Sequence, residues 1–155
     1  MQRIKHVRQK LQFGGNTILI AGDKRAESKC LKALLDDADV TGLYGKSGIF
    51  HGYAAPNSLA TLDSYVLIHR IDSVTLDAGV VDGTITDKLR RVRLQVDVAD
   101  VSYQRMVERS EIIKDALERK FPSCIDSDTN GLAVIGQKVW NVCSVDIIII
   151  ESEEE

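Results

Sequence analysis

The chain has 155 residues, of which 44% are hydrophobic and 28% charged, a composition typical of one folded domain rather than of a disordered segment. A formal net charge of −3 and an aromatic content of 5% argue against a protein that binds nucleic acid through phosphate contacts and base stacking. The longest apolar run, residues 147–150, is too short to cross a bilayer, and the basic N-terminus is not followed by the apolar stretch of a signal peptide.

The N-terminal part predicts one amphipathic helix after a less regular segment. Residues 2–12 carry apolar side chains at helical spacing among basic ones, which favours a short helix or an ordered arm, and residues 16–21 favour a short strand. Asp23 is a suitable N-cap for a helix whose apolar stripe comprises Ala26, Cys30, Leu31, Leu34, Leu35 and Ala38. The three aspartates at positions 36, 37 and 39 oppose the helix dipole and indicate where this helix ends.

The middle of the chain predicts a loop, a central strand and a hairpin. Residues 41–63 are rich in Gly, Pro, Ser and Asn, which favours a long irregular connection. Residues 64–71 alternate with apolar side chains on both faces, as in a central strand. Residues 72–88 contain two turn-forming sequences, DAG and DG, and predict an extended, exposed hairpin.

In the next segment, residues 91–121, the apolar residues first recur at every second position and then at every third or fourth position. Residues 92–98 place Val92, Leu94, Val96 and Val98 on one face and the polar Arg91, Arg93, Gln95 and Asp97 on the other, which predicts a half-buried strand. Ser102 is a suitable cap for a helix with the stripe Met106, Ser110, Ile113, Leu117 and Phe121. Pro122 limits any continuation of this helix.

The C-terminal part predicts a loop followed by a long strand. Residues 123–137 favour a loop with a possible short strand, and residues 138–151 alternate over their whole length. The predicted elements give one α+β domain over residues 1–155. We expect a mostly antiparallel sheet with two principal helices packed on it and a long exposed β-hairpin.

No catalytic centre is visible in the sequence, and we expect neither an enzyme nor a bound cofactor. The GKS that starts at Gly45 lacks the earlier glycine of a phosphate loop, because that position is Val40. His6, His51 and His69 have no metal or acid–base partners at defined spacing. Three cysteines, Cys30, Cys124 and Cys143, also lack metal spacing; Cys30 and Cys143 lie within apolar patterns, which favours small core residues in a reducing compartment.

The best local match to a metal motif lies in DSDTNG. Asp126, Asp128, Asn130 and Gly131 fit the start of a calcium-binding loop. Such a loop needs a bidentate glutamate at its twelfth position, but that position is Gln137. We therefore favour a polar turn over a metal site.

The order of these segments resembles that of a known structural family. DSYVLIHRIDS, which follows GIFHGYAAPNS, resembles the strand after the first helix in tail terminator and tail completion proteins of tailed bacteriophages. RVRLQVDVADVSYQRMVERSEIIKDALE resembles the most recognisable unit of that family, a strand of the R-V-x-V-x-V type that enters a helix near a tyrosine. KCLKALLDDADVTGLYG and KVWNVCSVDIIII are similar to its N-terminal helix and its closing strand. The resemblance covers roughly residues 27–150, which leaves residues 1–26 as an extension and residues 151–155 as an acidic tail.

The resemblance implies a virion protein of the tail or neck, assembled in the host cytoplasm. In that family, a ring of usually six subunits stops polymerisation of the tail tube and gives the tail a face for docking to the head. The implied partners are further copies of the chain, the tail tube protein and the head–tail connector protein. DNA would pass through the ring without specific binding, and no membrane is implied.

Two sets of residues are candidates for these contacts. The aliphatic side chains of the predicted hairpin would dock on the tube or pack on the domain's own sheet: Val74, Leu76, Val80, Val81 and Ile85. A channel that lets DNA pass should be acidic or neutral, and Asp97, Asp100 and Glu151 are candidates for its wall.

Three other interpretations remain open at this point. One is a head-side neck or connector protein. Another is a small enzyme or metal-binding α+β domain that uses Asp126, Asp128 and Asn130. The third places the chain in a contractile tail-like bacteriocin or a prophage remnant, which changes little of the physics.

Overall fold

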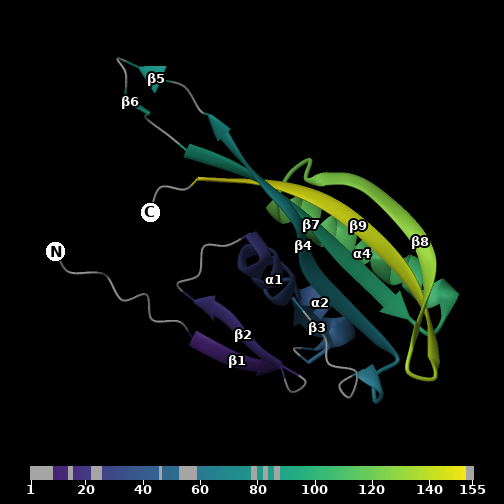
Figure 1. The fold of residues 1–155 in the computed structure, drawn as a ribbon. Helices are drawn as coiled ribbons and strands as arrows, with labels where there is room; N and C mark the ends of the chain where they lie inside the picture. The colour runs from purple at the N-terminus through teal and green to yellow at the C-terminus, as the bar shows by residue number, and fades with distance from the viewer. Residues whose placement is uncertain are drawn as a thin grey trace.

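A five-stranded sheet in the order β3-β4-β7-β9-β8 forms the body of the protein, as a computed structural model shows (Figure 1). The structure describes residues 9–13, 16–21, 26–45, 47–52, 59–77, 80–81, 84–85 and 88–152, and side chains within 26–45, 47–52, 59–74 and 89–151. The strands of the five-stranded sheet are β3 (Ile49–His51), β4 (Ser64–Asp77), β7 (Lys88–Asp100), β8 (Ile125–Ile135) and β9 (Lys138–Ser152). Of the strand pairs described in this sheet, β3–β4 is parallel and the others are antiparallel, so the predicted α+β fold with a mostly antiparallel sheet is confirmed.

Helices cover one face of this sheet. α1 (Ala26–Leu35) and α4 (Tyr103–Lys120) are the two long helices, and the short α2 (Ala38–Tyr44) packs beside both of them. The predicted stripe of α4 points into the core, where Met106, Ile113 and Leu117 are almost fully buried. The predicted stripe of α1 is buried from Ala26 to Leu34, but Ala38, its last predicted member, is exposed and starts α2. Ser102 caps α4 by accepting a hydrogen bond from the Arg105 N–H, as its position predicts. Among the described residues, no helix is both long and apolar enough to cross a membrane.

The prediction of an irregular connection over residues 41–63 is wrong for residues 41–44 and 49–51, which form regular elements. Thr41 to Tyr44 belong to α2. The Asp37 carboxylate caps the start of this helix by accepting hydrogen bonds from the N–H groups of Asp39 and Val40. Gly45 ends this helix with a φ of +60°, a conformation that glycine adopts without strain. Residues 49–51 then form β3, whose three residues pair in parallel with Val66, Leu67 and Ile68 of β4.

Two further predictions need correction. The sequence favours a short helix or an ordered arm over residues 2–12, but the described part of this segment belongs to a strand, β1 (Gln9–Phe13). It pairs with β2 (Asn16–Ala21), which confirms the strand predicted at 16–21. Residues 123–137 are predicted to be a loop with a possible short strand and a polar turn at DSDTNG, but residues 125–135 form the long strand β8. The register of β8 is fixed by β9, through a tight turn at Gly136 and Gln137 in which Gly136 has a φ of +63°.

The predicted hairpin over residues 72–88 is confirmed. β4 and β7 pair in register from Ser64 and Asp100 to Asp77 and Lys88. Beyond them, β5 (Val80–Val81) and β6 (Thr84–Ile85) pair with each other. Figure 1 shows β5 and β6 at the far end of the β4–β7 ribbon, away from the helices.

Candidate interaction surfaces

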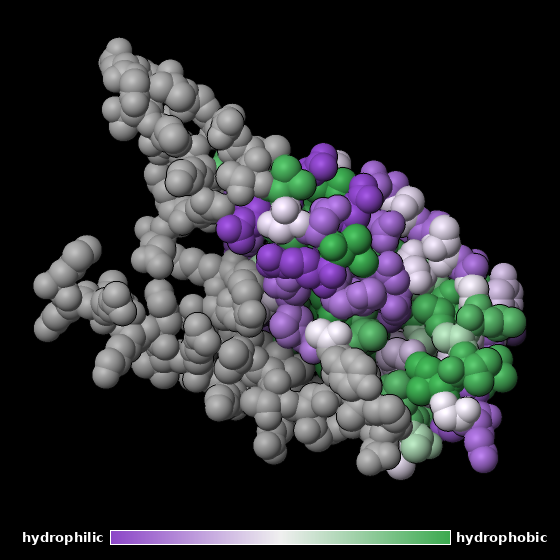
Figure 2. All heavy atoms as spheres, in the orientation of Figure 1, coloured by the Kyte–Doolittle hydropathy of each residue, from purple (hydrophilic) through white to green (hydrophobic). Residues whose placement is uncertain are grey.

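The face of the sheet opposite the helices divides into a polar middle and an apolar end. On the polar part, β7 presents Arg91, Arg93, Gln95 and Asp97 next to His69 of β4 and Ser144 of β9. At the end near the β8–β9 turn, a small cluster buries Phe50, Leu59, Tyr65, Ala99 and Trp140. Figure 2 shows the same division, with hydrophilic side chains over the middle of the visible face and hydrophobic ones gathered near that turn.

Asp97, the first of the acidic candidates, lies in a hydrogen-bonded cluster on the open face. His69 Nε2 lies 3.2 Å from Asp97 Oδ2, and Gln95 Nε2 donates to Asp97 Oδ1 at 2.8 Å. Burial alone would raise the pKa of Asp97, but hydrogen bonds from His69, Gln95 and Ser144 outweigh it and lower that pKa. The same bond to Asp97 raises the pKa of His69. Asp97 is therefore a partnered carboxylate that keeps its charge.

Asp100 and Glu151 lie on the helix-covered side and are buried. The Asp100 carboxylate is 0% exposed; it accepts hydrogen bonds from the Ser102 N–H at 2.7 Å and from Arg105 Nη2 at 3.0 Å, and Arg109 Nη1 lies 3.9 Å away. It therefore fixes the joint between β7 and α4. Glu151 is 8% exposed, and its Oε2 lies 3.8 Å from Lys29 Nζ of α1.

The structure does not bring the three acidic candidates together. Asp100 ends β7, whereas Glu151 pairs in register with Arg90 near the start of that strand. Asp97 faces the opposite side of the sheet from both. Of the three, only Asp97 lies on the open face of this chain, and its side chain is 16% exposed.

The hairpin candidates are described in part. Val74 is 42% exposed on β4, where it pairs in register with Arg91. The backbones of Leu76, Val80, Val81 and Ile85 lie in the hairpin, and their side chains lie outside the described part of the structure. The body also exposes Ile71 (47%) and Ile150 (52%), of β4 and β9.

The structure does not assemble a metal or acid–base site from the described residues that were candidates for one. Asp126 and Asp128 lie in β8 and form ion pairs with Arg93 and Lys114. Across the described residues, no group of three or more His, Cys, Asp or Glu side chains lies close enough to hold a metal ion. His51 and His69 lie on neighbouring strands, but His51 pairs in register with Ile68, so the two imidazoles belong to opposite faces. His6 and Lys46 lie outside the described residues.

A pocket of about 360 Å³ lies at the β8–β9 turn. Leu59, Ala60, Ile135, Gly136, Gln137, Lys138 and Trp140 line it. The Lys138 ammonium, the titratable group in this lining, donates a hydrogen bond to the Leu62 carbonyl at 2.7 Å and lies over the Trp140 ring. These residues form an apolar hollow rather than an acid–base pair.

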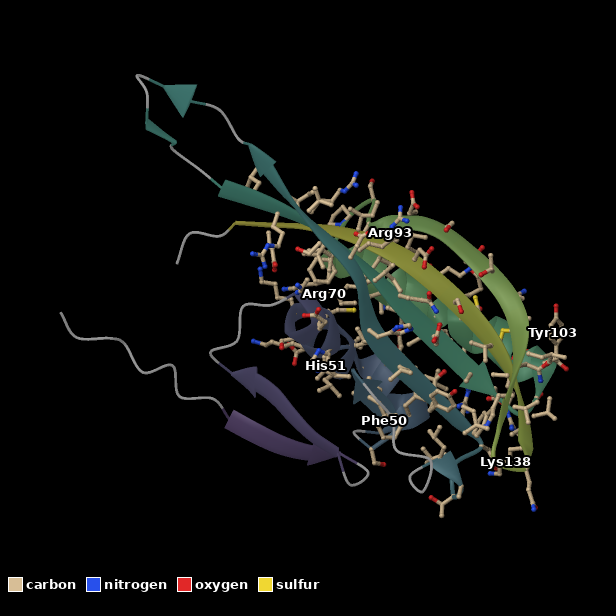
Figure 3. All side chains as sticks on the ribbon, viewed as in Figure 1. Phe50, His51, Arg70, Arg93, Tyr103 and Lys138 are labelled. Carbon is tan, nitrogen blue, oxygen red and sulfur yellow. The ribbon has the colours of Figure 1, made fainter. Side chains whose placement is uncertain are left out.

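One surface was missed by the sequence reasoning. Leu132 and Val134 of β8 are 72% and 71% exposed, and Val139 beside them on β9 is 54% exposed. Figure 3 shows Tyr103, at the start of α4, projecting beyond the sheet at the same end of the molecule. The alternation within TNGLAVI was a signal for this strand, but the turn-forming Asp, Asn and Gly residues around it favoured a loop.

No protein-family model matches the sequence, and no curated protein is significantly similar to it.

Proposed function

We propose that the chain is a structural subunit of a phage tail, of the tail terminator or tail completion type. In this proposal, copies of the chain form a ring, usually of six, at the head-proximal end of the tail. The ring ends polymerisation of the tube and offers the connector a docking face. The protein would be part of the virion, assembled in the host cytoplasm, and would not be an enzyme.

The observation that carries this proposal is the long β4–β7 hairpin, which extends beyond a body formed by one sheet and its helices (Figure 1). The body follows the order that the resemblance implies: α1, β4, the hairpin, β7 running directly into α4, and β9. A subunit that contacts neighbours above and below needs such an extended element on a rigid base. Ring closure requires contacts between two different surfaces of each copy.

The open face supports the passage of DNA in a limited way. Asp97 is the acidic candidate that this face offers, and its lowered pKa keeps it charged at neutral pH. Asp100 and Glu151 are buried and support the fold instead. Arg91 and Arg93 lie on the same face, so a lumen wall formed by it would be mixed in charge rather than uniformly acidic.

A head-side neck protein is an alternative that the same fold and the same surfaces would support. It would form a ring but would not limit tube length. The metal-binding alternative loses support, because Asp126 and Asp128 are extended along a strand and already have cationic partners.

The test of the ring is the mass of the purified chain by light scattering, with negative-stain images of the same peak. About six copies in ring-shaped particles support the proposal, since cyclic closure gives a fixed number of subunits. Single chains at every concentration contradict it.

The test of the terminator function is genetic. In the phage or prophage that encodes the chain, removing it should give tails of uncontrolled length that do not join heads. A plasmid copy should restore normal tails, whereas a copy with Val80→Asp and Val81→Asp should form rings without restoring them. Ile150→Asp is the matched control, because it places the same charge on an exposed aliphatic position outside the hairpin. Tails of normal length without the chain would favour the head-side alternative.

A further inference from the structure

The pocket at the β8–β9 turn is lined in part by the only tryptophan of the chain. Its volume of about 360 Å³ lies near the lower limit for small-molecule sites. Leu59 and Ala60 line it from the segment before β4, and Ile135 and Trp140 line it from β8 and β9. Figure 3 shows Lys138, a further lining residue, at this end of the molecule. Because most of these side chains are apolar, the body of an occupant should be apolar as well.

The indole of Trp140 carries a buried donor without an acceptor. Trp140 is 0% exposed, and no described residue accepts a hydrogen bond from its Nε1–H. Tyr65 packs against the indole in a T-shaped contact, with ring centroids 4.9 Å apart and planes at 74°. An aromatic ring is at best a weak acceptor, whereas a buried N–H group without a partner is costly to the fold. An oxygen atom beside the indole would remove this cost.

Lys138 supplies a second donor at the pocket. Its ammonium lies 5.5 Å from the centroid of the Trp140 ring and donates to the Leu62 carbonyl at 2.7 Å. An ammonium has three N–H donors, so this hydrogen bond does not exhaust it. The Asp63 carboxylate lies 3.8 Å away, but it is 77% exposed and forms only a weak ion pair. The pocket therefore presents two donors and, within its described lining, no carboxylate.

We propose that this pocket binds a small apolar carboxylate, such as a medium-chain fatty acid. The hydrocarbon body of the ligand fills the apolar hollow. One carboxylate oxygen accepts a hydrogen bond from Trp140 Nε1, and the other pairs with the Lys138 ammonium.

Entry of the carboxylate requires a movement of Lys138. The ammonium of this residue lies over the ring of Trp140, so it must turn toward the ligand before the indole can be reached. The Lys138 side chain is 35% exposed and has a flexible four-carbon stem, which permits this movement. The ion pair with the ligand replaces the contact between the ammonium and the ring.

This site goes beyond the proposed function and does not depend on it. It lies at the opposite end of the sheet from the hairpin (Figure 1) and is built from residues of one chain. Rings that do not bind the carboxylate would overturn this proposal alone. Single chains that bind it would overturn the ring alone.

The test is a titration of the purified chain with octanoate, followed by tryptophan fluorescence. Trp140 is the only tryptophan, so the emission reports on this pocket. Octanoate should give a saturable change and bind about tenfold more tightly than octan-1-ol, which carries no charge to pair with Lys138. Octylamine, a cation at neutral pH, should bind more weakly than the alcohol. A change that does not saturate, or equal affinities for the acid and the alcohol, would overturn the proposal.

Two variants assign the donors, with affinities measured by calorimetry. Trp140→Phe keeps an aromatic ring but removes the N–H group, so the affinity for octanoate should fall about tenfold. Lys138→Met keeps the apolar stem but removes the charge. It should lower the affinity for octanoate to that for octan-1-ol and leave the affinity for the alcohol unchanged. Equal losses for the acid and the alcohol would show that Lys138 has only a structural role.

A third variant locates the ligand. Ala60 is exposed and lines the pocket, so Ala60→Phe should fill the hollow and abolish binding. Val139→Phe is the matched control, because Val139 is 54% exposed and faces the opposite side of β9 from Trp140. Both substitutions are at exposed positions, so far-UV circular dichroism should match that of the wild type. Octanoate binding that survives Ala60→Phe as well as Val139→Phe would contradict the assignment of this pocket.

Discussion

On the helix-covered face, β7 presents Val92, Leu94, Val96 and Val98, all fully buried, whereas the open face of the same strand presents Arg91, Arg93, Gln95 and Asp97. The first row packs on α1 and α4, and the second joins hydrogen bonds and ion pairs that water can reach. One strand thus separates two kinds of interaction. The buried row sets the stability of the fold, and the polar row is free to serve contacts with other molecules.

The largest effect is expected from Leu94→Ala, which removes a side chain with no exposed surface from the centre of the buried row. The cavity left among the helices should lower the free energy of unfolding by about 2–5 kcal/mol. Urea denaturation measures this change. Ile150→Ala, at a position 52% exposed on the last strand, is the control and should change stability by about 0.5 kcal/mol or less. Equal losses at the two sites would remove the contrast between buried and exposed positions.

The next effect is expected at Asp100, a charge on the buried side. Asp100→Asn keeps the shape but removes the carboxylate that Arg105 and the Ser102 N–H share. Hydrogen bonds to charged groups contribute about 1.5–3 kcal/mol, and Arg105 is half-exposed, so we expect a loss near the lower limit. Urea denaturation again gives the value. Asp63→Asn, whose carboxylate is 77% exposed, should have almost no effect.

A smaller, pH-dependent effect is expected from His69 and Asp97. The raised pKa of His69 means that its contribution is complete below its ordinary pKa of 6.5 and is lost as the pH rises through the folded value. The lowered pKa of Asp97 means that its contribution is present above its ordinary 3.8 and is lost as the pH falls. The pair should therefore stabilise most between these two values, by on the order of 0.5 kcal/mol given its partial exposure.

The difference in unfolding free energy between the wild type and His69→Gln measures this contribution. It should be larger at pH 5.5 than at pH 8. The control repeats this comparison in an Asp97→Asn background, between the Asp97→Asn variant and the Asp97→Asn/His69→Gln double variant. In that background the difference in unfolding free energy should no longer depend on pH. A difference that grows with rising pH would contradict the assigned direction.

The smallest effect is expected from the exposed ion pair of Arg93 and Asp126, whose side chains are 38% and 46% exposed. A double-mutant cycle with alanine should give a coupling energy of about 0.2–1 kcal/mol that decreases with added salt. A coupling as large as the loss at Leu94 would show that the open face stabilises the fold as strongly as the buried one.

The sequence predicted most where one period ran without interruption. Val92 to Val98 followed by Met106 to Leu117 predicted β7 and α4, because burial of one face dictates both spacings and Ser102 marks the change. β8 was missed because Asp126, Asp128 and Asn130 are turn residues by local preference. Pairing with β9 holds this segment extended, and Arg93 and Lys114, which are not adjacent in sequence, neutralise Asp126 and Asp128.

The candidate surfaces were harder to predict than the fold. Asp97 and Asp100 are close in sequence, yet the alternation of the strand and two arginines from α4 place them in different environments. The aspartates after α1 mark its end, as predicted, but the sequence did not show that Asp37 also caps the next helix and binds Arg119 of α4. In each case a distant partner decides what a carboxylate does.

The position of β9 has a consequence for synthesis on the ribosome. This strand lies between β7 and β8, although it follows both in the chain. A nascent chain that has emerged only as far as the β8–β9 turn has β7 without its second neighbour and β8 without any strand to pair with. The apolar row of β7 then lacks the cover that Cys143, Val145 and Ile147 later help to form. The sheet can be completed only after residues 138–152 have been made, so part of the apolar row stays exposed until that moment.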